Sequence, residues 1–346
     1  MISNKLYFEK LNFYFKNSLP FCSFRPPNKN IATCYSSKTT DIPKIKNPRG
    51  SGFIISSFNT EKGSYLIPPD TVISTKILKL KTYEYVKSNK KETNLNKYKK
   101  DYIDAVSDII DRISKSELVK MVYSRSFEFE LESHNVFDVY KNILNLYPNA
   151  YCYLFFHPSE GFWMGASPET LLEINKTKIS TMALAGTKKI NDSNWGHKEL
   201  NEQKIVQEEI KKNLTPLCNN LNFQKTKSSN AGDIKHLKTI ITGNTNKSPR
   251  EIINKLHPTP ATAGVPLDKA LSNIFLKEKH DRSFYAGYLG IIDDYDCELY
   301  VNLRSMSISN NIVKVFVGGG ITSDSEPENE WEEIVQKSQT MLKVIF

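Results

Sequence analysis

The chain has 346 residues, of which 39% are hydrophobic and 11% aromatic, so it can bury a large core, and general disorder is excluded. No run approaches about 18 uninterrupted apolar residues, which excludes a membrane-spanning helix, and the five cysteines form no CxxC pair, which argues against a zinc ribbon or a disulfide scaffold. The net charge of +9 is unevenly placed, because residues 1–100 hold 19 Lys and Arg against six Asp and Glu, while the rest of the chain is acidic overall.

The front third is predicted to form short strands and turns over residues 1–86, followed by a polar linker at 87–100. Gly50 and Gly52 precede an apolar run at 53–55, and Pro68-Pro69 ends the next one. The lysine-rich stretch 87–100 is typical of a solvated segment. The basic charge leaves a nucleic-acid-binding protein as a remote alternative, although no motif of stacking aromatic residues accompanies it. Because charged residues interrupt any signal-peptide core, we expect a cytoplasmic protein with no nucleic-acid or membrane partner.

From residue 101 onward the apolar pattern predicts separate helices and strands. Helical spacing covers 101–113 and is followed by alternation over 121–131, which places Lys120 on the polar face of a strand. Further strands are predicted at 150–156, 162–165, 170–174, 178–183, 285–293, 299–307 and 312–317. Helices are predicted at 198–214, 251–256, 267–277 and after Ser325. Ser325 is expected to cap the last helix in a Ser-x-x-Glu capping box with Glu328. Residues 226–233 are predicted to form a polar break between elements. Runs of strands broken by separate helices indicate an α+β fold.

Carboxylates lie beside the apolar face of two predicted helices. Glu202 shares its face with an apolar stripe, and Glu330 and Glu333 are three residues apart on the last helix. Such side chains either edge the core as ion pairs, as Glu333 and Lys337 would at i, i+4, or point into a site. If they converge, they suit a hard cation such as Mg²⁺, which prefers oxygen ligands.

Four rigid segments could form the walls of a site: Gly165-Ala166-Ser167-Pro168-Glu169, Ala183-Leu184-Ala185-Gly186-Thr187, Leu256-His257-Pro258-Thr259-Pro260-Ala261 and Gly318-Gly319-Gly320. The first places the carboxylate of Glu169 after a proline at a strand end, and the glycine of the second permits close approach of the backbone to a ligand. The triple glycine is a weak phosphate cradle, since it lacks the P-loop lysine and the GxGxxG spacing. A histidine such as His236, taken alone, is more often structural than catalytic.

Taken in this order, the segments resemble the chorismate-binding enzyme family, which includes isochorismate, salicylate, anthranilate and aminodeoxychorismate synthases. The resemblance runs from about residue 120 to 342 and also includes Lys120-Met121-Val122-Tyr123-Ser124-Arg125, His236-Leu237, Tyr285-Ala286-Gly287, Val301-Asn302-Leu303-Arg304 and the acidic stretch from Pro327 to Lys337. It implies a large antiparallel β-sandwich with helices packed outside and a deep cleft between the sheets. Residues 101–346 would be the chorismate-binding catalytic core, and 1–86 a variable N-terminal part of the same fold.

The resemblance also implies roles for individual residues. Glu202 and Glu333 match the family's Mg²⁺ ligands, and Glu330 a water-mediated one. The residues that match substrate-binding positions are Gly186, Thr187, His236, Ala261, Arg304, Gly318 and Lys337. Chorismate is a dicarboxylate, to which Arg304 would offer a planar fork and Lys337 a point charge. His236 would lie near the leaving hydroxyl, and Ala261 near the nucleophile.

Lys120 and Glu169 match the general base and the general acid. Hydroxide is a poor leaving group, so its loss requires an acid, and a water nucleophile requires a base. Such a lysine must be partly neutral near pH 7, which burial or a nearby cation such as Arg125 would favour. Relatives that use ammonia carry a non-basic residue at position 120, and aminodeoxychorismate synthase has a lysine in the segment where this chain has Ala185. The resemblance therefore indicates an isomerase, isochorismate synthase, which would serve menaquinone or siderophore synthesis.

Salicylate synthase, which goes on to eliminate pyruvate from isochorismate, is the alternative that the sequence separates least well. The chain departs from the family pattern at Gln203, where many relatives have His, at Thr262 and Ala263, and at Lys188, which replaces a common Arg. These departures concern the positioning of the substrate. No Cys-His-Glu glutaminase segment is evident, so we expect no glutaminase subunit, and the resemblance implies a monomer or dimer.

Overall fold

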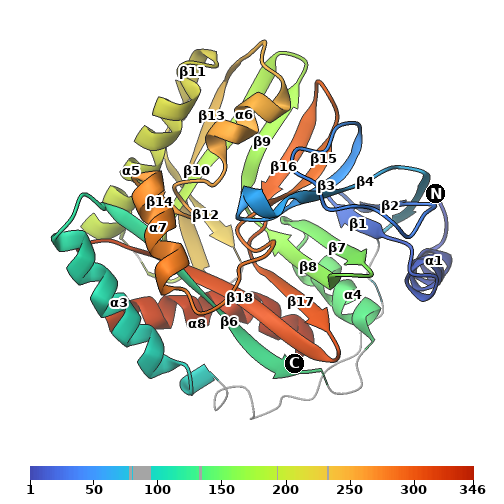
Figure 1. Cartoon of the computed structure of the whole chain (residues 1–346), viewed down its shortest axis with the longest axis horizontal. Coiled ribbons are helices and arrows are strands. Elements are labelled where there is room, and N and C mark those ends of the chain that lie inside the picture. Colours follow the sequence, from blue (N-terminus) through green and yellow to red (C-terminus); the bar gives the residue numbers. More distant parts are fainter. Residues whose placement is uncertain (78–79, 81–94, 132–134, 193, 232–233) are drawn as a thin grey trace.

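The structure, a computed structural model, describes residues 1–346 apart from 78–79, 81–94, 132–134, 193 and 232–233. This part of the chain forms two large antiparallel sheets (Figure 1). In spatial order, the first sheet contains β14 (Gly264–Val265), β6 (Lys120–Glu130), β18 (Ile312–Ile321), β17 (Ser305–Ser309), β8 (Gly161–Ser167), β7 (Tyr151–His157), β1 (Phe21–Arg25), β2 (Ile31–Ser36) and β5 (Thr71–Lys76). The second contains β11 (Asn219–Phe223), β13 (Ile234–Asn244), β10 (Lys178–Lys189), β9 (Thr170–Asn175), β16 (Cys297–Val301), β15 (Tyr288–Ile292), β3 (Gly52–Ser56) and β4 (Ser64–Ile67), and β12 (Lys227–Ala231) pairs with β13. The predicted α+β sandwich is confirmed.

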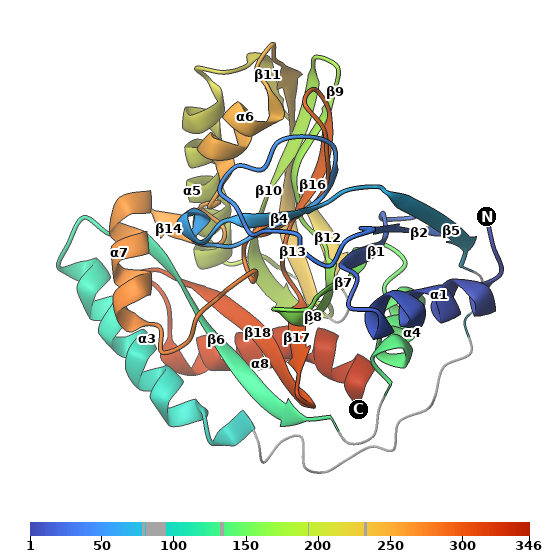
Figure 2. The same cartoon turned by 45° about the vertical axis from the view of Figure 1, so that its right-hand side comes forward.

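Helices lie on the outer sides of the sheets (Figures 1 and 2). Their bounds are α1 (Asn4–Lys16), α3 (Lys99–Ser114), α4 (Val136–Leu146), α5 (His197–Leu214), α6 (Pro249–Leu256), α7 (Leu267–Lys277) and α8 (Pro327–Ile345), with a short 3-10 turn at Thr60–Lys62. Helices α3, α4 and α8 cover the first sheet, α5 and α6 cover the second, and α7 packs on β6 and β14. In the described residues, no helix is both long and apolar enough to span a bilayer.

The prediction that residues 1–86 hold only strands and turns is wrong at their start, where α1 forms. Ser3 caps this helix, because its Oγ accepts a hydrogen bond from Leu6 N at 3.3 Å. Tyr7, Leu11 and Tyr14 are buried at helical spacing and pack into the core of the first sheet. The following strands join both sheets, since β1, β2 and β5 pair in the first sheet and β3 and β4 in the second.

Other boundaries also differ from those predicted. Residues 87–94 of the expected linker lie outside the described residues, whereas α3 begins at Lys99 and Leu95 is buried. The stretch 226–233 contains β12, which pairs with β13 despite its polarity. The last helix begins at Pro327, and Ser325 does not cap it, because Ser325 Oγ accepts instead from Thr322 N at 3.1 Å in the preceding turn.

The most consequential difference concerns the single strand predicted at 299–307. It is two strands, β16 and β17, which belong to different sheets, and the chain crosses between the sheets at residues 302–304. The chain makes a similar crossing between β8 and β9, at Pro168 and Glu169. Apolar alternation alone cannot detect such a crossing, because strands in both sheets have the same period of two.

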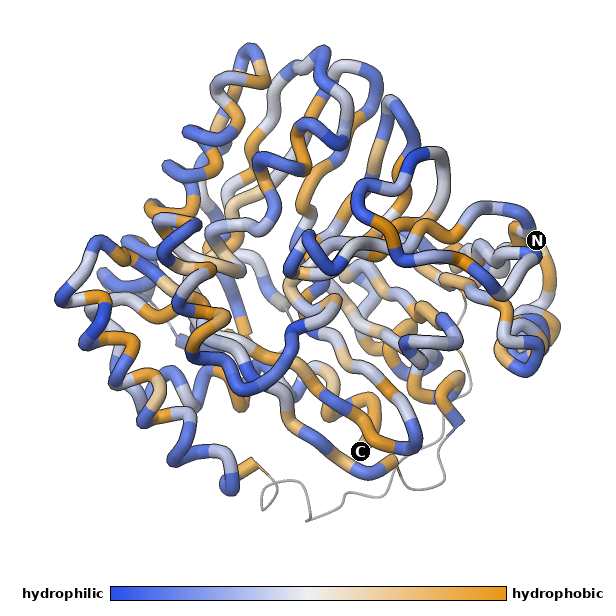
Figure 3. The backbone as a smooth tube through the Cα atoms, in the orientation of Figure 1, coloured by the Kyte–Doolittle hydropathy of each residue, from blue (hydrophilic) through white to orange (hydrophobic). Residues whose placement is uncertain are grey.

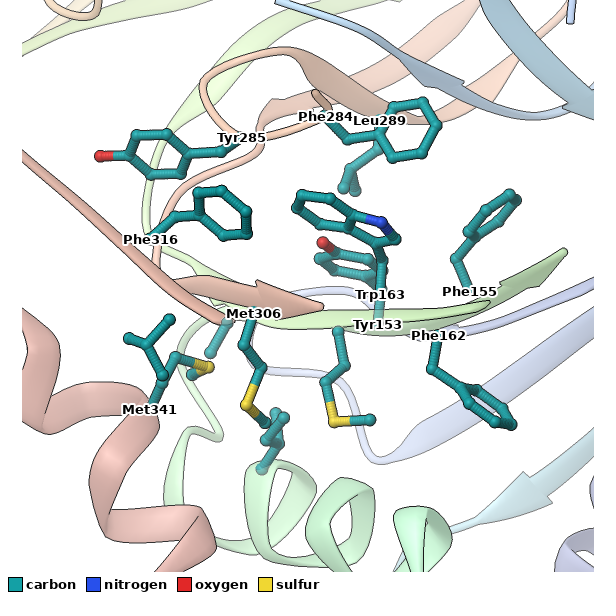
Figure 4. Close-up of a cluster of buried hydrophobic side chains, with 14 of the residues drawn as sticks. Tyr153, Phe155, Phe162, Trp163, Phe284, Tyr285, Leu289, Met306, Phe316 and Met341 are labelled. Atoms are coloured by element: carbon teal, nitrogen blue, oxygen red, sulfur yellow. The ribbon is translucent and has the colours of Figure 1, made fainter. Parts of the chain in front are cut away.

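An aromatic layer fills the space between the sheets above the middle of the first sheet (Figure 4). Trp163 on β8 stacks on Phe316 of β18 with ring centroids 5.0 Å apart, and it meets the edge of Phe284 at 5.3 Å. Met306 and Phe162 lie on the other face of the same sheet, toward the helices (Figure 4). Along the helices, hydrophilic and hydrophobic stretches alternate, because only one face of each helix is buried (Figure 3).

Replacing Trp163 with Ala should lower the free energy of unfolding by about 3–5 kcal/mol, because it removes the ring that joins β8, β18 and the segment before β15 and leaves a cavity. Chemical denaturation followed by circular dichroism measures the change. Tyr295→Ala, at a side chain that is 80% exposed, is the control and should change stability by no more than about 0.5 kcal/mol. Equal effects of the two substitutions would contradict the assigned role of this layer.

Candidate active site

A cavity lies between the two sheets and receives residues from both crossings. The predicted site residues that line it are Glu169, Gly186, Thr187, Glu202, His236, Ala261, Arg304, Gly318 and Lys337. Lys120 and Glu333 do not line the cavity directly, but each forms an ion pair with a residue that does, Glu202 and Lys337 respectively. Glu330 does not line the cavity either, and its Oε2 lies beside Gly319 on β18. The structure therefore brings together residues that are spread over more than 200 positions of the sequence.

Several residues in or beside the cavity were not assigned a role from the sequence. Tyr285, Leu303 and Phe316 line it, together with Thr262. Tyr285 belongs to the segment Tyr285-Ala286-Gly287, which resembles the family, so its place beside the site could have been predicted. Lys198 pairs with Glu330, and its position four residues before Glu202 on α5 was the signal that it shares that helix face.

Glu169 is held in the cavity by the backbone of the two crossings. Its N–H donates to Ser167 Oγ at 3.3 Å, and its carbonyl accepts from Val301 N at 3.0 Å. The side chain is almost completely buried, with 2% of the residue exposed, and this burial raises the pKa of Glu169 to about 8. The positive charges of Lys120, Arg304 and Lys337 act against this rise without cancelling it. Glu169 is therefore mostly a neutral acid at pH 7 and can donate a proton.

Arg304 sits at the other crossing in a left-handed backbone conformation, with φ of 49°. Its carbonyl accepts from Ala166 N at 3.0 Å, which ties it to the end of β8. Arg304 Nη2 lies 3.1 Å from His236 Nε2, whereas Arg304 Nε is buried and has no hydrogen-bond partner among the described residues. A buried guanidinium with unused donors in a cavity is suited to binding a carboxylate.

His236 is neutral, and its partners define the tautomer. Arg304 can only donate, so Nε2 of His236 is the acceptor, and Nδ1 carries the proton that it donates to Gly186 O at 3.0 Å. Burial, together with the charges of Arg304 and Lys337, lowers the pKa of His236 to about 3. In this structure His236 orients Arg304 and joins it to β10.

Glu202 is fixed by a bulge in β10. The register between β10 and β13 shifts between Ala185 and Thr187, and Gly186 adopts φ of 65°, which a glycine tolerates without strain. Gly186 N then donates to Glu202 Oε2 at 3.1 Å, while the other oxygen, Oε1, lies 2.9 Å from Lys120 Nζ. Both oxygens of Glu202 are thus occupied by groups of the protein.

Lys120 is completely buried, which corrects the prediction of a strand residue on an open polar face. Strand β6 is covered on both sides near its start, and only its far end, at Glu128 and Glu130, has a solvated face. Arg125 is not the cation beside Lys120, because residues 120 and 125 point to opposite faces of the strand. Arg125 instead donates to Tyr98 O at 2.7 Å on the helix side.

The triple glycine allows three polar groups to approach β18 closely. A Cβ atom at Gly318 would lie 3.1 Å from Tyr285 Oη, and one at Gly319 would lie 3.2 Å from Glu330 Oε2. At Gly320 it would collide with Glu202 Oε1. Gly320 therefore leaves room for Glu202, and Gly318 and Gly319 lie in tight surroundings, which explains a motif that the sequence showed only as a weak phosphate cradle.

The three predicted metal ligands are paired with lysines: Glu202 with Lys120, Glu330 with Lys198, and Glu333 with Lys337 at 2.6 Å. The last is the i, i+4 pair considered from the sequence, but it is largely buried and not on the surface. Across the described residues, no group of three His, Cys, Asp or Glu side chains is placed to hold a metal ion.

The carboxylates nevertheless fit a hard divalent cation. Mg²⁺ is commonly held by one or two protein carboxylates, with water and substrate oxygens completing its shell. Glu330 Oε2 is buried and lacks a hydrogen-bond partner among the described residues. Burial and the neighbouring charge of Glu333 raise the pKa of Glu330, whereas Lys337 and Lys198 outweigh burial and lower the pKa of Glu333. Two adjacent carboxylates of this kind can share a cation.

Comparisons with known proteins identify the family of the chain. The family model described as "Chorismate binding enzyme" matches residues 23–346, which includes most of the front third that the sequence motifs left out. The chain is 28% identical to isochorismate synthase MenF of Haemophilus influenzae over 73% of this chain and 62% of that protein. It is 31% identical to isochorismate synthase MenF of Escherichia coli over 65% of this chain and 56% of that protein. The chain thus spans less than two thirds of the length of these relatives.

Two solved structures share the fold over nearly the whole chain. One, from Bacillus anthracis, is described as a 2,3-dihydroxybenzoate-specific isochorismate synthase, DhbC; it has a TM-score of 0.81, 23% identity and coverage of 97% of this chain and 98% of that one. The other, MenF from Escherichia coli, has a TM-score of 0.78, 21% identity and coverage of 94% and 89%. With the family model matched from residue 23 to the end, the chain belongs to the chorismate-binding enzyme family.

Proposed function

We propose that this protein is an Mg²⁺-dependent isochorismate synthase, which converts chorismate to isochorismate. The observation that carries the proposal is the combination of a buried carboxyl that keeps its proton at neutral pH and lines the cavity, Glu169, with a buried lysine, Lys120, that contacts the cavity-lining residue Glu202. A neutral acid and an amine base are what an exchange of one hydroxyl for another requires. The curated relatives described above carry the same name, isochorismate synthase.

The charges of the cavity suit a dicarboxylate. With Glu169 neutral, the charged side chains that line the cavity are two cations, Arg304 and Lys337, and one carboxylate, Glu202. The free Nε of Arg304 offers a directed contact to one substrate carboxylate, and Lys337 lines the same wall. Phe316 and Leu303 provide apolar surface for the ring.

The reaction balances without a redox partner. Lys120 would accept a proton from a water molecule while that oxygen forms a bond to one ring carbon. The ring double bond shifts, the bond to the departing hydroxyl breaks, and Glu169 gives that oxygen its proton, so that water leaves. One water enters and one leaves, the proton gained by Lys120 returns to Glu169 through solvent, and the product is an isomer of the substrate.

Glu202 and Glu333 would hold the metal, with Glu330 adjacent. When bound, Mg²⁺ would supply positive charge to a substrate carboxylate and help to orient the ring. Each oxygen of Glu202 has a second lone pair, so Glu202 could face a metal while it keeps its contacts with Gly186 N and Lys120.

Pure protein incubated with chorismate and Mg²⁺ should form isochorismate, identified by chromatography, and EDTA should abolish the reaction until Mg²⁺ is restored. Salicylate with pyruvate as the main products would instead identify a salicylate synthase. Because we assign Lys120 to activating a water molecule as the nucleophile, added ammonium salts should give no aminated product at a comparable rate. No change of chorismate under any of these conditions would reject the proposal.

Lys120→Ala and Glu169→Gln should each lower kcat by about 10²–10⁴-fold, the range for loss of one general acid or base, with little change in KM. Arg304→Ala should behave differently and raise KM, because it removes a charged contact to the substrate and leaves the chemistry in place. Steady-state kinetics with chorismate measure both effects. If the Lys120 and Glu169 variants keep more than about half of the wild-type kcat, neither residue is the acid or base.

The raised pKa of Glu169 should also appear in the pH dependence of stability. Between the ordinary value of 4.5 and about 8, folded Glu169 keeps a proton that the unfolded chain has lost, so its contribution to stability declines as the pH rises. The decline is at most about 1.4 kcal/mol per pH unit and ends above the folded pKa. Denaturation of wild type and Glu169→Gln from pH 5 to 9 should show the wild type losing stability relative to the variant up to about pH 8. Parallel curves would show that Glu169 is not protonated at neutral pH.

A further inference from the structure

The side chain of Gln203 is buried directly behind the bulge in β10, and both of its N–H donors and its carbonyl oxygen form hydrogen bonds with one strand pair, β10 and β13. Its Oε1 accepts from Ala185 N at 2.9 Å. Its Nε2 donates to Ala183 O at 3.1 Å and to Thr239 Oγ1 at 3.1 Å. Only 2% of the residue is exposed, and it does not line the cavity. A buried amide with every partner in place is a rigid connection between α5 and β10.

The bulge that Gln203 contacts connects Glu202 on one side with His236 and Arg304 on the other. On one side, Gly186 N donates to Glu202, the neighbour of Gln203 on α5. On the other side, Gly186 O accepts from His236, which in turn accepts from Arg304. A shift of the bulge would therefore move the carboxylate that we assign to the metal and the guanidinium that we assign to the substrate at the same time.

We propose that Gln203 is a positioning residue, which fixes the Ala185–Gly186 bulge and through it sets the places of Glu202, His236 and Arg304. The expected kinetic effects rest on the proposed function, whereas the role of Gln203 in fixing the bulge does not. It also explains a departure from the family pattern noted in the sequence, because many relatives have His at this position. A neutral histidine has one donor and one acceptor and can meet at most two of the three partners that Gln203 meets.

The substitution Gln203→Met keeps the length of the side chain and removes its hydrogen bonds. We expect kcat/KM for chorismate to fall about 10–100-fold and the dissociation constant for Mg²⁺, measured by calorimetry without substrate, to rise about 10-fold or more, as for other residues that orient metal ligands. Gln203→His should lie between wild type and Gln203→Met. The matched control is Gln207→Met, one turn along the same helix, because the side-chain hydrogen bond of Gln207 within the described part of the chain goes to Thr226 Oγ1, at 3.5 Å, and not to the bulge.

Hydrogen exchange of the backbone amides of Ala185 and Gly186 gives a readout that requires no activity. Both amides should exchange faster in Gln203→Met and at the wild-type rate in Gln207→Met. Faster exchange at Gly186 is the decisive part, because this amide bonds Glu202 and not Gln203.

The results separate this inference from the proposed function. If wild type converts no chorismate, the proposed function fails, and the exchange rates still decide the role of Gln203. If Gln203→Met only unfolds at a lower temperature, while its kinetic constants, Mg²⁺ affinity and Gly186 exchange match wild type, the positioning role is wrong. Should Gln203→Met not fold, Gln203→His decides by the same criteria, with wild-type values in every measurement overturning the inference.

Discussion

Two neighbouring crossings between the sheets are the constraint on which the rest of the site depends. Where β8 leads into β9 and β16 leads into β17, backbone groups leave their ladders and need new partners. The two crossings supply these partners to each other: Val301 N donates to Glu169 O, Ala166 N donates to Arg304 O, and Ser167 Oγ donates to Val301 O. The acid and the guanidinium are therefore placed by main-chain hydrogen bonds at the junction of the sheets, and the cavity opens between them.

Burial at this junction has two effects that belong together. It disfavours charge on isolated groups, which keeps Glu169 protonated and His236 neutral at pH 7. Where charges are retained, it requires opposite partners, and each of Glu202, Glu330 and Glu333 accordingly faces a lysine. Burial alone would lower the pKa of Lys198, but the carboxylates of Glu330 and Glu333 outweigh it and raise that pKa above its ordinary value. Burial at the junction thus keeps Glu169 able to donate a proton, and it encloses the paired charges that a metal and a dicarboxylate would meet.

Local patterns in the sequence predicted most of the individual elements. Tyr102, Val106, Ile109 and Ile113 are the buried residues of α3, as their spacing indicated, and α6 and α7 end where the apolar pattern ends. The residues of the site were found because they resemble a family in order and spacing, and the cavity brings most of them together. Lys198 and the role of Gln203 were missed, because a helix face shows which residues are neighbours but not what lies opposite them.

The sequence by itself determined the α+β class, the family and most of the residues that carry charge in the site, since these follow from composition, period and motif. Only the tertiary structure decided which sheet each strand joins, because the period of two is the same in both. It alone decided that Lys120 is enclosed, that Arg125 faces away from it, and that Glu333 and Lys337 pair inside the molecule and not on its surface. Burial depends on what packs against a residue from distant parts of the chain, and that packing also raises the pKa of Glu169 and holds the bulge behind Glu202.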